Sequence, residues 1–237
     1  MPKNNIINLF EEILDTSYIL SGDELKSRFY HIWKTDISLE SLCLLLPKSS
    51  EEISAIVKIC NDNNQEIIVH GGLTNLVGST ISNRSQVVIS LERMNKIIEI
   101  DEQGKTITCE SGAIIEDIIN AVKDKDLLLP LNFGARGSAQ IGGAVSTNAG
   151  GLRVFKYGMT RNLVMGIEAI LPDGTIISSL KKSFKKGFDK LITKLKEVIN
   201  NDFALLFLLY NTIFAINEIY TFSKRPEYGS PCCNTYH

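Results

Sequence analysis

The feature that most constrains this chain is a glycine-containing stretch that directly follows a short apolar run. Residues 66–70, EIIVH, have the composition of a buried strand, and GGLTNLVGST follows at once. The nucleoside-triphosphate loop G-x-x-x-x-G-K-[ST] is excluded, because five residues separate Gly72 from Gly78 and Ser79 stands where the lysine belongs. The dinucleotide fingerprint G-x-G-x-x-G is also absent from this stretch.

Two interpretations of this stretch remain open. Glycine backbone N–H groups can surround an anion such as a diphosphate, and Thr74, Asn75 and Ser79 would add side-chain donors. The alternative is a simple tight turn, which would account for one or two of the glycines.

A second run of small and polar residues favours the ligand interpretation. Residues 127–158 are rich in Gly, Ala, Ser, Thr and Asn, and within them IGGAVSTNAGG contains two glycine pairs, Gly142-Gly143 and Gly150-Gly151. Such a run predicts backbone that closely approaches something. Two loops of this kind in one domain predict one extended ligand between them, such as a dinucleotide.

Hydrophobic spacing and turn signals predict an α+β fold, because strands, hairpins and helices are mixed without strict alternation. The expected elements are a strand near 42–46, a helix beginning at Ser49 or Ser50, strands at 66–70 and 86–91, a hairpin over 96–110, a helix over 113–125 and a hairpin over 162–180.

Composition excludes several classes of function. The formal net charge is −2 and the pI is near 6.0, so nucleic-acid binding is not expected. The five cysteines form no CxxC pair, which predicts reduced thiols and no metal site. The N-terminus does not resemble a secretory signal, and the apolar segment 203–216 is shorter than the roughly 18 residues of a spanning helix. A cytoplasmic location is therefore expected, with peripheral membrane contact not indicated.

Five collinear stretches resemble a known family: HGGLTNLVGS, VVISLERMNKI, CESGAIIEDI, LLPLNFGARGSAQIGGAVSTNAGGLRVFKYG and GIEAILPDGTII. They are similar to the FAD-binding domain of vanillyl-alcohol-oxidase flavoproteins, also called the p-cresol methylhydroxylase (PCMH) type, and within it to D-2-hydroxyacid dehydrogenases acting on D-lactate, glycolate or D-2-hydroxyglutarate. The resemblance implies a PCMH-type domain of two α+β subdomains over residues 39–180. Residues 1–38 would be an N-terminal helical segment, and residues 181–237 an aberrant tail arising from a deletion or frameshift.

The resemblance also implies which residues bind the cofactor, and Leu73 at the position of the covalent histidine of some relatives implies non-covalent FAD. The first loop would hold the pyrophosphate, and the second run would lie along the cofactor near the flavin. The implied residues are Gly71, Gly72, Leu73, Thr74, Asn75, Gly78, Ser79, Pro130, Gly134, Ser138, Gln140, Ile141, Gly142, Gly143, Thr147, Asn148 and Ala149.

The implied reaction is oxidation of a small-molecule D-2-hydroxy acid to a 2-oxo acid, with hydride transfer to the flavin. The family's substrate-binding and cap region has no counterpart here, and none of His31, His70 and His237 stands in a family catalytic context. The catalytic residues are therefore unknown, and an incomplete enzyme is expected. The alternatives are a non-catalytic FAD-binding subunit or remnant that needs a cap-bearing partner, or a different flavoenzyme on the same fold, such as a sugar-nucleotide reductase.

Overall fold

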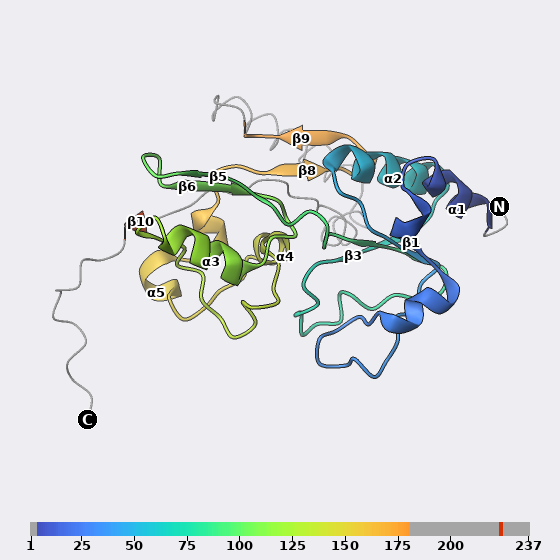
Figure 1. Ribbon diagram of the computed structural model, residues 1–237, viewed down its shortest axis with the longest axis horizontal. Coiled ribbons are helices and arrows are strands. Elements are labelled where there is room, and N and C mark those ends of the chain that lie inside the picture. The colour runs from blue at the N-terminus through green and yellow to red at the C-terminus, as the bar shows by residue number, and fades with distance from the viewer. Residues whose placement is uncertain (1–3, 181–222, 225–237) are drawn as a thin grey trace, which may run out of the picture.

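Short strands of branched apolar residues form a four-stranded sheet in the N-terminal part of the protein. A computed structural model describes residues 4–180 and 223–224 (Figure 1). The sheet order is β1-β2-β4-β3, with β1 antiparallel to β2 and the other neighbours parallel. Its strands are β1 (Ile19–Leu20), β2 (Cys43–Leu45), β3 (Ile67–His70) and β4 (Val87–Ser90).

Both faces of this sheet are buried, and successive residues alternate between them. On β2, Cys43 and Leu45 face the larger core, which α1 (Asn4–Glu11) and α2 (Ser50–Asp62) help to build. Leu44 belongs to a smaller cluster on the other face, together with Leu25 from the 3₁₀ helix η2 (Gly22–Ser27). Burial on both faces explains why these strands are continuous apolar runs rather than alternating ones.

Helix α2 forms as its sequence predicts. Ser49 is the N-cap, and its side chain accepts a hydrogen bond from the backbone N–H of Glu52. The apolar face that the spacing predicts is buried; it consists of Ile53, Ile56, Val57 and Cys60.

A second subdomain follows with a core of its own. The hairpin of β5 (Ile97–Asp101) and β6 (Thr106–Cys109) lies against α3 (Ile115–Lys123), and the core also takes in residues from 127–145. The remaining elements of this part are β7 (Leu127–Leu128), α4 (Ile141–Ser146), α5 (Val154–Tyr157) and the 3₁₀ helix η3 (Thr160–Leu163). The predicted α+β class with two subdomains is therefore confirmed.

The last hairpin returns the chain to the first subdomain. Strands β8 (Glu168–Ile170) and β9 (Ile176–Ser178), orange in Figure 1, extend to α2. There the Ser50 hydroxyl donates to a Glu168 carboxylate oxygen at 2.8 Å, and Ile170 enters the larger core. The hairpin thus connects residues 168–170 to the first subdomain.

The N-terminal range 1–38 holds α1, the 3₁₀ helix η1 (Thr16–Tyr18), β1 and η2. Its Phe10 and Ile19 share the core of residues from 43–60. Most of the range 181–237 lies outside the described residues; Ser223–Lys224 form β10, which pairs antiparallel with β7. The division at residues 38 and 180 and the origin of the tail therefore stay predictions. Within residues 4–180 and 223–224, no helix has the length and apolar character needed to cross a membrane.

Gly112 lies where the two subdomains join. Its N–H donates to the Met94 carbonyl at 2.7 Å, and a Cβ at this position would lie 2.0 Å from the Leu91 carbonyl oxygen. Both neighbours are backbone atoms of the segment that links β4 to β5, so they cannot move aside cheaply.

Gly112→Ala is therefore expected to lower the free energy of unfolding by about 2 kcal/mol or more, since overpacking a close backbone contact costs about 1–3 kcal/mol. Gly134→Ala is the matched control, because nothing lies within 4 Å of a Cβ built there. Urea unfolding of the two variants measures the difference, and equal stabilities would contradict the proposed backbone contact.

Candidate functional site

The first glycine loop lies at the carboxyl end of β3 and packs against the second glycine-rich run. A Cβ on Gly72 would lie 2.0 Å from the Ser138 carbonyl oxygen and 2.8 Å from the Ala139 Cα. A Cβ on Gly71 would lie 3.5 Å from Gln140 Oε1. The structure thus brings together two stretches that are almost 70 residues apart in the sequence, as the ligand interpretation requires.

The Gln140 side chain is unusual at this junction. Gln140 is 7% exposed, and its Oε1 atom is buried with no hydrogen-bond partner among the described residues. Leaving a buried amide oxygen unpaired costs free energy, so such atoms are rare in folded proteins. Gln140 was predicted as a cofactor-binding residue. Its side-chain oxygen is a buried acceptor at the junction of the two loops that has no partner among the described residues.

Backbone N–H groups of the first loop are unpaired over a continuous stretch. Among the residues that the structure describes, the N–H groups of residues 71–76 donate no hydrogen bond to a protein atom. Leu73 has a left-handed backbone conformation with φ 54°, and Gly78 has φ 75°. Successive free N–H groups around such a residue form a concave nest that attracts anions.

The Asn75 side chain differs from expectation. Instead of facing a ligand, its Oδ1 accepts from the N–H groups of Val77 and Ser79 at 3.3 and 3.1 Å, and its Nδ2 donates to the Thr80 hydroxyl at 2.8 Å. Asn75 therefore shapes the loop from inside, because Asn side chains readily bond backbone groups two or more residues on.

Close backbone approach also governs the second run. Gly142 donates its N–H to the Ser111 carbonyl at 2.8 Å, and a Cβ on it would lie 2.7 Å from the Ser111 Cβ. By contrast, nothing lies within 4 Å of a Cβ on Gly143, which is exposed on α4. Gly142 is therefore needed for packing inside the protein. Gly143 instead exposes its backbone at the surface of the described region, with no side chain to cover it.

The other predicted residues of this run are spread between core and surface. The Thr147 hydroxyl bonds the Gly143 carbonyl at 2.8 Å, and Asn148 Oδ1 accepts from the Arg161 N–H at 2.9 Å. The Ala149 carbonyl accepts from Thr160. The buried members are Pro130, Gln140, Ile141 and Gly142, and the exposed members are Gly134, Ser138, Gly143 and Thr147.

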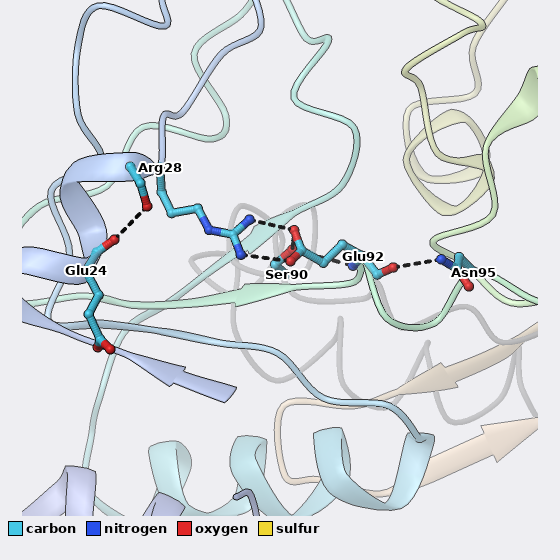
Figure 2. A network of polar contacts seen from close by, with 6 residues as sticks. Glu24, Arg28, Ser90, Glu92 and Asn95 are labelled. Atoms are coloured by element: carbon cyan, nitrogen blue, oxygen red, sulfur yellow. Dashed lines mark hydrogen bonds and ion pairs between the residues drawn. The ribbon is translucent and has the colours of Figure 1, made fainter. Parts of the chain in front are cut away.

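Two arginines near the site, Arg28 and Arg136, are already paired with carboxylates. Arg136 Nε donates to Glu116 at 3.1 Å. Figure 2 shows Arg28 reaching Glu92 through two guanidinium nitrogens, each at 2.9 Å. Because each of these charges is neutralised by a partner, an anion in the first loop would be held mainly by backbone N–H groups.

The Arg28–Glu92 pair also fixes a neighbouring loop. Glu92 follows Ser90, the last residue of β4, and the Arg28 carbonyl accepts from the Leu39 N–H at 2.7 Å. Phe29 and Ser38 form a further antiparallel bridge. Residues 28–39 therefore form a loop whose two ends are hydrogen-bonded to each other, and it is anchored at the same edge of the sheet as the first glycine loop.

His70 is a buried neutral histidine at the end of β3. It is 3% exposed, and its Nε2 lies 2.9 Å from the Thr80 carbonyl oxygen. Because a carbonyl only accepts, Nε2 carries the proton. Burial lowers the pKa of His70 to about 4, although the Thr80 carbonyl and Glu92 favour the charged form.

Residues 30–32 and Thr80 contact the first loop, although the sequence did not indicate them as site residues. The Thr80 hydroxyl donates to the Tyr30 carbonyl, and His31 contacts the Asn75 carbonyl. Thr80 is the last residue of the stretch GGLTNLVGST, but the implied cofactor residues of that stretch end at Ser79. No spacing rule connects His31 to a loop more than 40 residues away.

Comparison with known proteins agrees with this geometry. Residues 41–179 match the family described as "FAD binding domain". The chain is 38% identical over 174 residues to "Probable D-2-hydroxyglutarate dehydrogenase, mitochondrial" from Oryza sativa subsp. indica, which covers 73% of this chain and 31% of the relative. The chain thus spans about a third of the length of this curated relative.

Solved structures share the fold. Alkyldihydroxyacetonephosphate synthase superposes with a TM-score of 0.73 at 16% identity, covering 94% of this chain and 44% of the other. p-Cresol methylhydroxylase superposes with a TM-score of 0.59 at 21% identity, covering 74% of this chain and 35% of the other. These similarities establish the PCMH-type fold, as the resemblance implied.

The residues present fit FAD, the cofactor that these findings support. The free N–H groups at 71–76 suit its diphosphate, and the exposed backbone at Gly143 allows a flat ring to approach closely.

The free energy of unfolding is expected to decrease as the pH is lowered, because of His70. In the unfolded chain, His70 binds a proton as the pH falls below the ordinary histidine pKa of 6.5. In the folded protein, buried His70 stays neutral until the pH falls to about 4. The contribution of His70 to stability is therefore complete above pH 6.5 and is lost as the pH falls from 6.5 towards 4, at up to about 1.4 kcal/mol per pH unit. Denaturant unfolding from pH 7 to 4 should show a shallower pH slope for His70→Gln, and identical slopes would contradict the buried neutral state.

Gly143→Ala separates folding from cofactor binding. The free energy of unfolding without FAD should stay the same or rise by up to about 1 kcal/mol, because alanine favours helices and the space is open. If FAD lies against this turn of α4, the added methyl group should weaken FAD binding about tenfold or more. Fluorescence titration with FAD measures the affinity, and unchanged affinity would place the cofactor elsewhere.

Proposed function

We propose that this chain, which belongs to the FAD binding domain family, supplies the cofactor-binding part of a D-2-hydroxyacid dehydrogenase. The domain match spans residues 41–179, nearly all of the described region beyond the N-terminal segment. The rice relative is named as a probable D-2-hydroxyglutarate dehydrogenase. Because the chain spans about a third of that relative, the activity of the whole protein is part of the proposal.

The contact between the two glycine loops carries the proposal. Gly72 lies directly against the Ser138 carbonyl, while the N–H groups of residues 71–76 have no partner among the described residues. A dinucleotide needs its diphosphate and its ring held at two separate places within one continuous site. The two loops supply such a pair of places, the first beside β3 and the second at α4.

The residues of each loop have different tasks. The first loop would bind the diphosphate through backbone N–H groups, without a lysine. The second would let the flavin approach the bare backbone near Gly143. When bound, FAD supplies the acceptor for the hydride that leaves the carbon of the hydroxy acid. Leu73 cannot form the covalent link that a histidine could, so non-covalent binding stays a prediction.

The base that takes the hydroxyl proton has no candidate among the described histidines. His70 is buried and neutral, and His31 is bonded to the Asn75 carbonyl and the Trp33 N–H. Both belong to the first loop rather than to the second run, where the reacting ring is proposed to lie. We therefore assign substrate binding and catalysis to groups outside residues 4–180.

The second candidate is a non-catalytic FAD-binding subunit, which would need a partner subunit to supply the cap. The paired arginines favour it, since Arg28 and Arg136 are held by Glu92 and Glu116 and cannot clamp a substrate carboxylate without breaking those pairs. Peripheral contact with a membrane surface is not indicated by the sequence, and no described residue adds support for it. A cytoplasmic location also stays a prediction, because the rice relative is named as mitochondrial.

The purified full chain is expected to be yellow with FAD, and its flavin should not bleach when D-lactate or D-2-hydroxyglutarate is added anaerobically. A chimaera that joins residues 1–180 to the C-terminal region of the rice relative supplies the missing groups. Its flavin should bleach with D-2-hydroxyglutarate and not with the L-enantiomer, as followed by visible absorption.

Three outcomes would count against these assignments. A folded chain that binds no FAD would overturn the cofactor site. Bleaching of the chain alone would show that this chain already holds the catalytic groups. A yellow chimaera that none of the hydroxy acids reduces would favour the non-catalytic subunit.

A further inference from the structure

Thr80 stands at the centre of a hydrogen-bond set that joins the first glycine loop to the rest of the protein. We call this set the clasp; it comprises Tyr30, His31, His70, Asn75 and Thr80. Thr80 is 6% exposed, and both of its oxygens are used. Its hydroxyl donates to the Tyr30 carbonyl at 2.6 Å and accepts from Asn75 Nδ2 at 2.8 Å. Its carbonyl accepts from His70 Nε2 at 2.9 Å.

His31 holds the other side of the loop. The Trp33 N–H donates to His31 Nδ1 at 3.0 Å, so Nδ1 is the unprotonated nitrogen and Nε2 carries the proton. Nε2 lies 2.5 Å from the Asn75 carbonyl oxygen and therefore donates to it. Next to it, the Ile32 N–H donates to the Leu73 carbonyl at 3.2 Å.

These bonds determine where the loop N–H groups point. In a planar trans peptide, the carbonyl of one residue and the N–H of the next point in opposite directions, and the described residues contain no cis peptide bond. Because the Leu73 carbonyl is bonded to Ile32, the N–H of Thr74 points away from segment 30–33. The Asn75 carbonyl is bonded to His31, so the N–H of Leu76 points away as well.

Thr80 selects which N–H groups remain free. Its hydroxyl binds Asn75 Nδ2, which leaves Asn75 Oδ1 turned towards the N–H groups of Val77 and Ser79. Those two groups are satisfied within the loop. The N–H groups of residues 71–76 are left without partners among the described residues, while three carbonyls that would repel an anion are bonded from outside.

We propose that Thr80 and His31 are positioning residues for FAD. His31 holds the Asn75 carbonyl away from the cofactor diphosphate, and the Thr80 hydroxyl fixes the Asn75 side-chain amide, so that the backbone N–H groups stay aimed at the diphosphate. The inference rests on the proposed placement of the diphosphate in the first loop. Neither side chain is required to touch the cofactor. Preorganising the loop before binding raises affinity, because the ordering cost is met during folding.

Thr80→Val tests the role of the hydroxyl, since valine has nearly the same shape but neither donates nor accepts. In the full-length chain freed of FAD, we expect the variant to bind FAD about tenfold more weakly. Thr80→Ser keeps the hydroxyl and should restore affinity to within about threefold. ADP contains the diphosphate without the flavin, so its affinity should fall by the same factor as that of FAD.

Ser82→Ala is the matched control. The Ser82 hydroxyl donates to the Glu40 backbone carbonyl at 2.6 Å, just beyond the loop and outside the clasp. Removing it deletes a hydroxyl-to-backbone bond like that of Thr80, yet FAD affinity should not change. Thermal unfolding of each FAD-free variant reports the structural cost separately.

His31→Ala keeps the inference testable if Thr80→Val does not fold, because His31 is half-buried and its loss leaves no buried cavity at the strand end. It should also weaken FAD and ADP together. Folded variants at both positions that bind FAD as tightly as the parent would overturn the inference, as would a loss shared by Ser82→Ala. Failure of the parent chain itself to bind FAD would instead overturn the proposed cofactor site.

Discussion

The close backbone contact between Gly72 and the Ser138 carbonyl is the constraint on which the site depends. A Cβ at residue 72 would lie 2.0 Å from that oxygen, so only glycine permits the two subdomains to meet as they do. Gly112 plays a similar part beneath the Leu91 carbonyl. Both contacts join a subdomain built on a mostly parallel sheet to one built on a hairpin and a helix, and the glycine loops lie at this boundary.

Hydrogen-bond satisfaction explains how a loop rich in glycine keeps one shape. Glycine loses more conformational entropy on folding than other residues do, so a glycine-rich loop without restraints would populate many conformations. Here the carbonyls of Leu73, Asn75 and Thr80 are all bonded from outside the loop or from its base. The N–H groups of residues 71–76 stay without a partner among the described residues, and successive free donors of this kind suit an anion.

Local signals were sufficient for most elements of the fold. The Ser49 cap, the buried face of α2 and the two hairpins follow from capping, periodicity and turn residues, which act over short distances. Two other expectations depended on distant groups. Asn75 was expected to face a ligand, but Thr80 and the loop N–H groups bind its side chain. His31 was given no role because it does not stand in a family catalytic context, and its proposed positioning role depends on the loop of residues 28–39, which Arg28 and Glu92 anchor.

By itself, the sequence determined that two donor-rich glycine loops follow strand and helix signals in one α+β chain, and that the first loop matches neither the triphosphate nor the Rossmann pattern. Residue type and spacing decide these points, since glycine freedom and turn chemistry are local. Only the tertiary structure decided that Gly72 meets Ser138, that Gly142 serves packing while Gly143 stays open, and which N–H groups remain free. Those outcomes depend on which backbone atoms lie opposite one another, and that is set by the packing of the two subdomains.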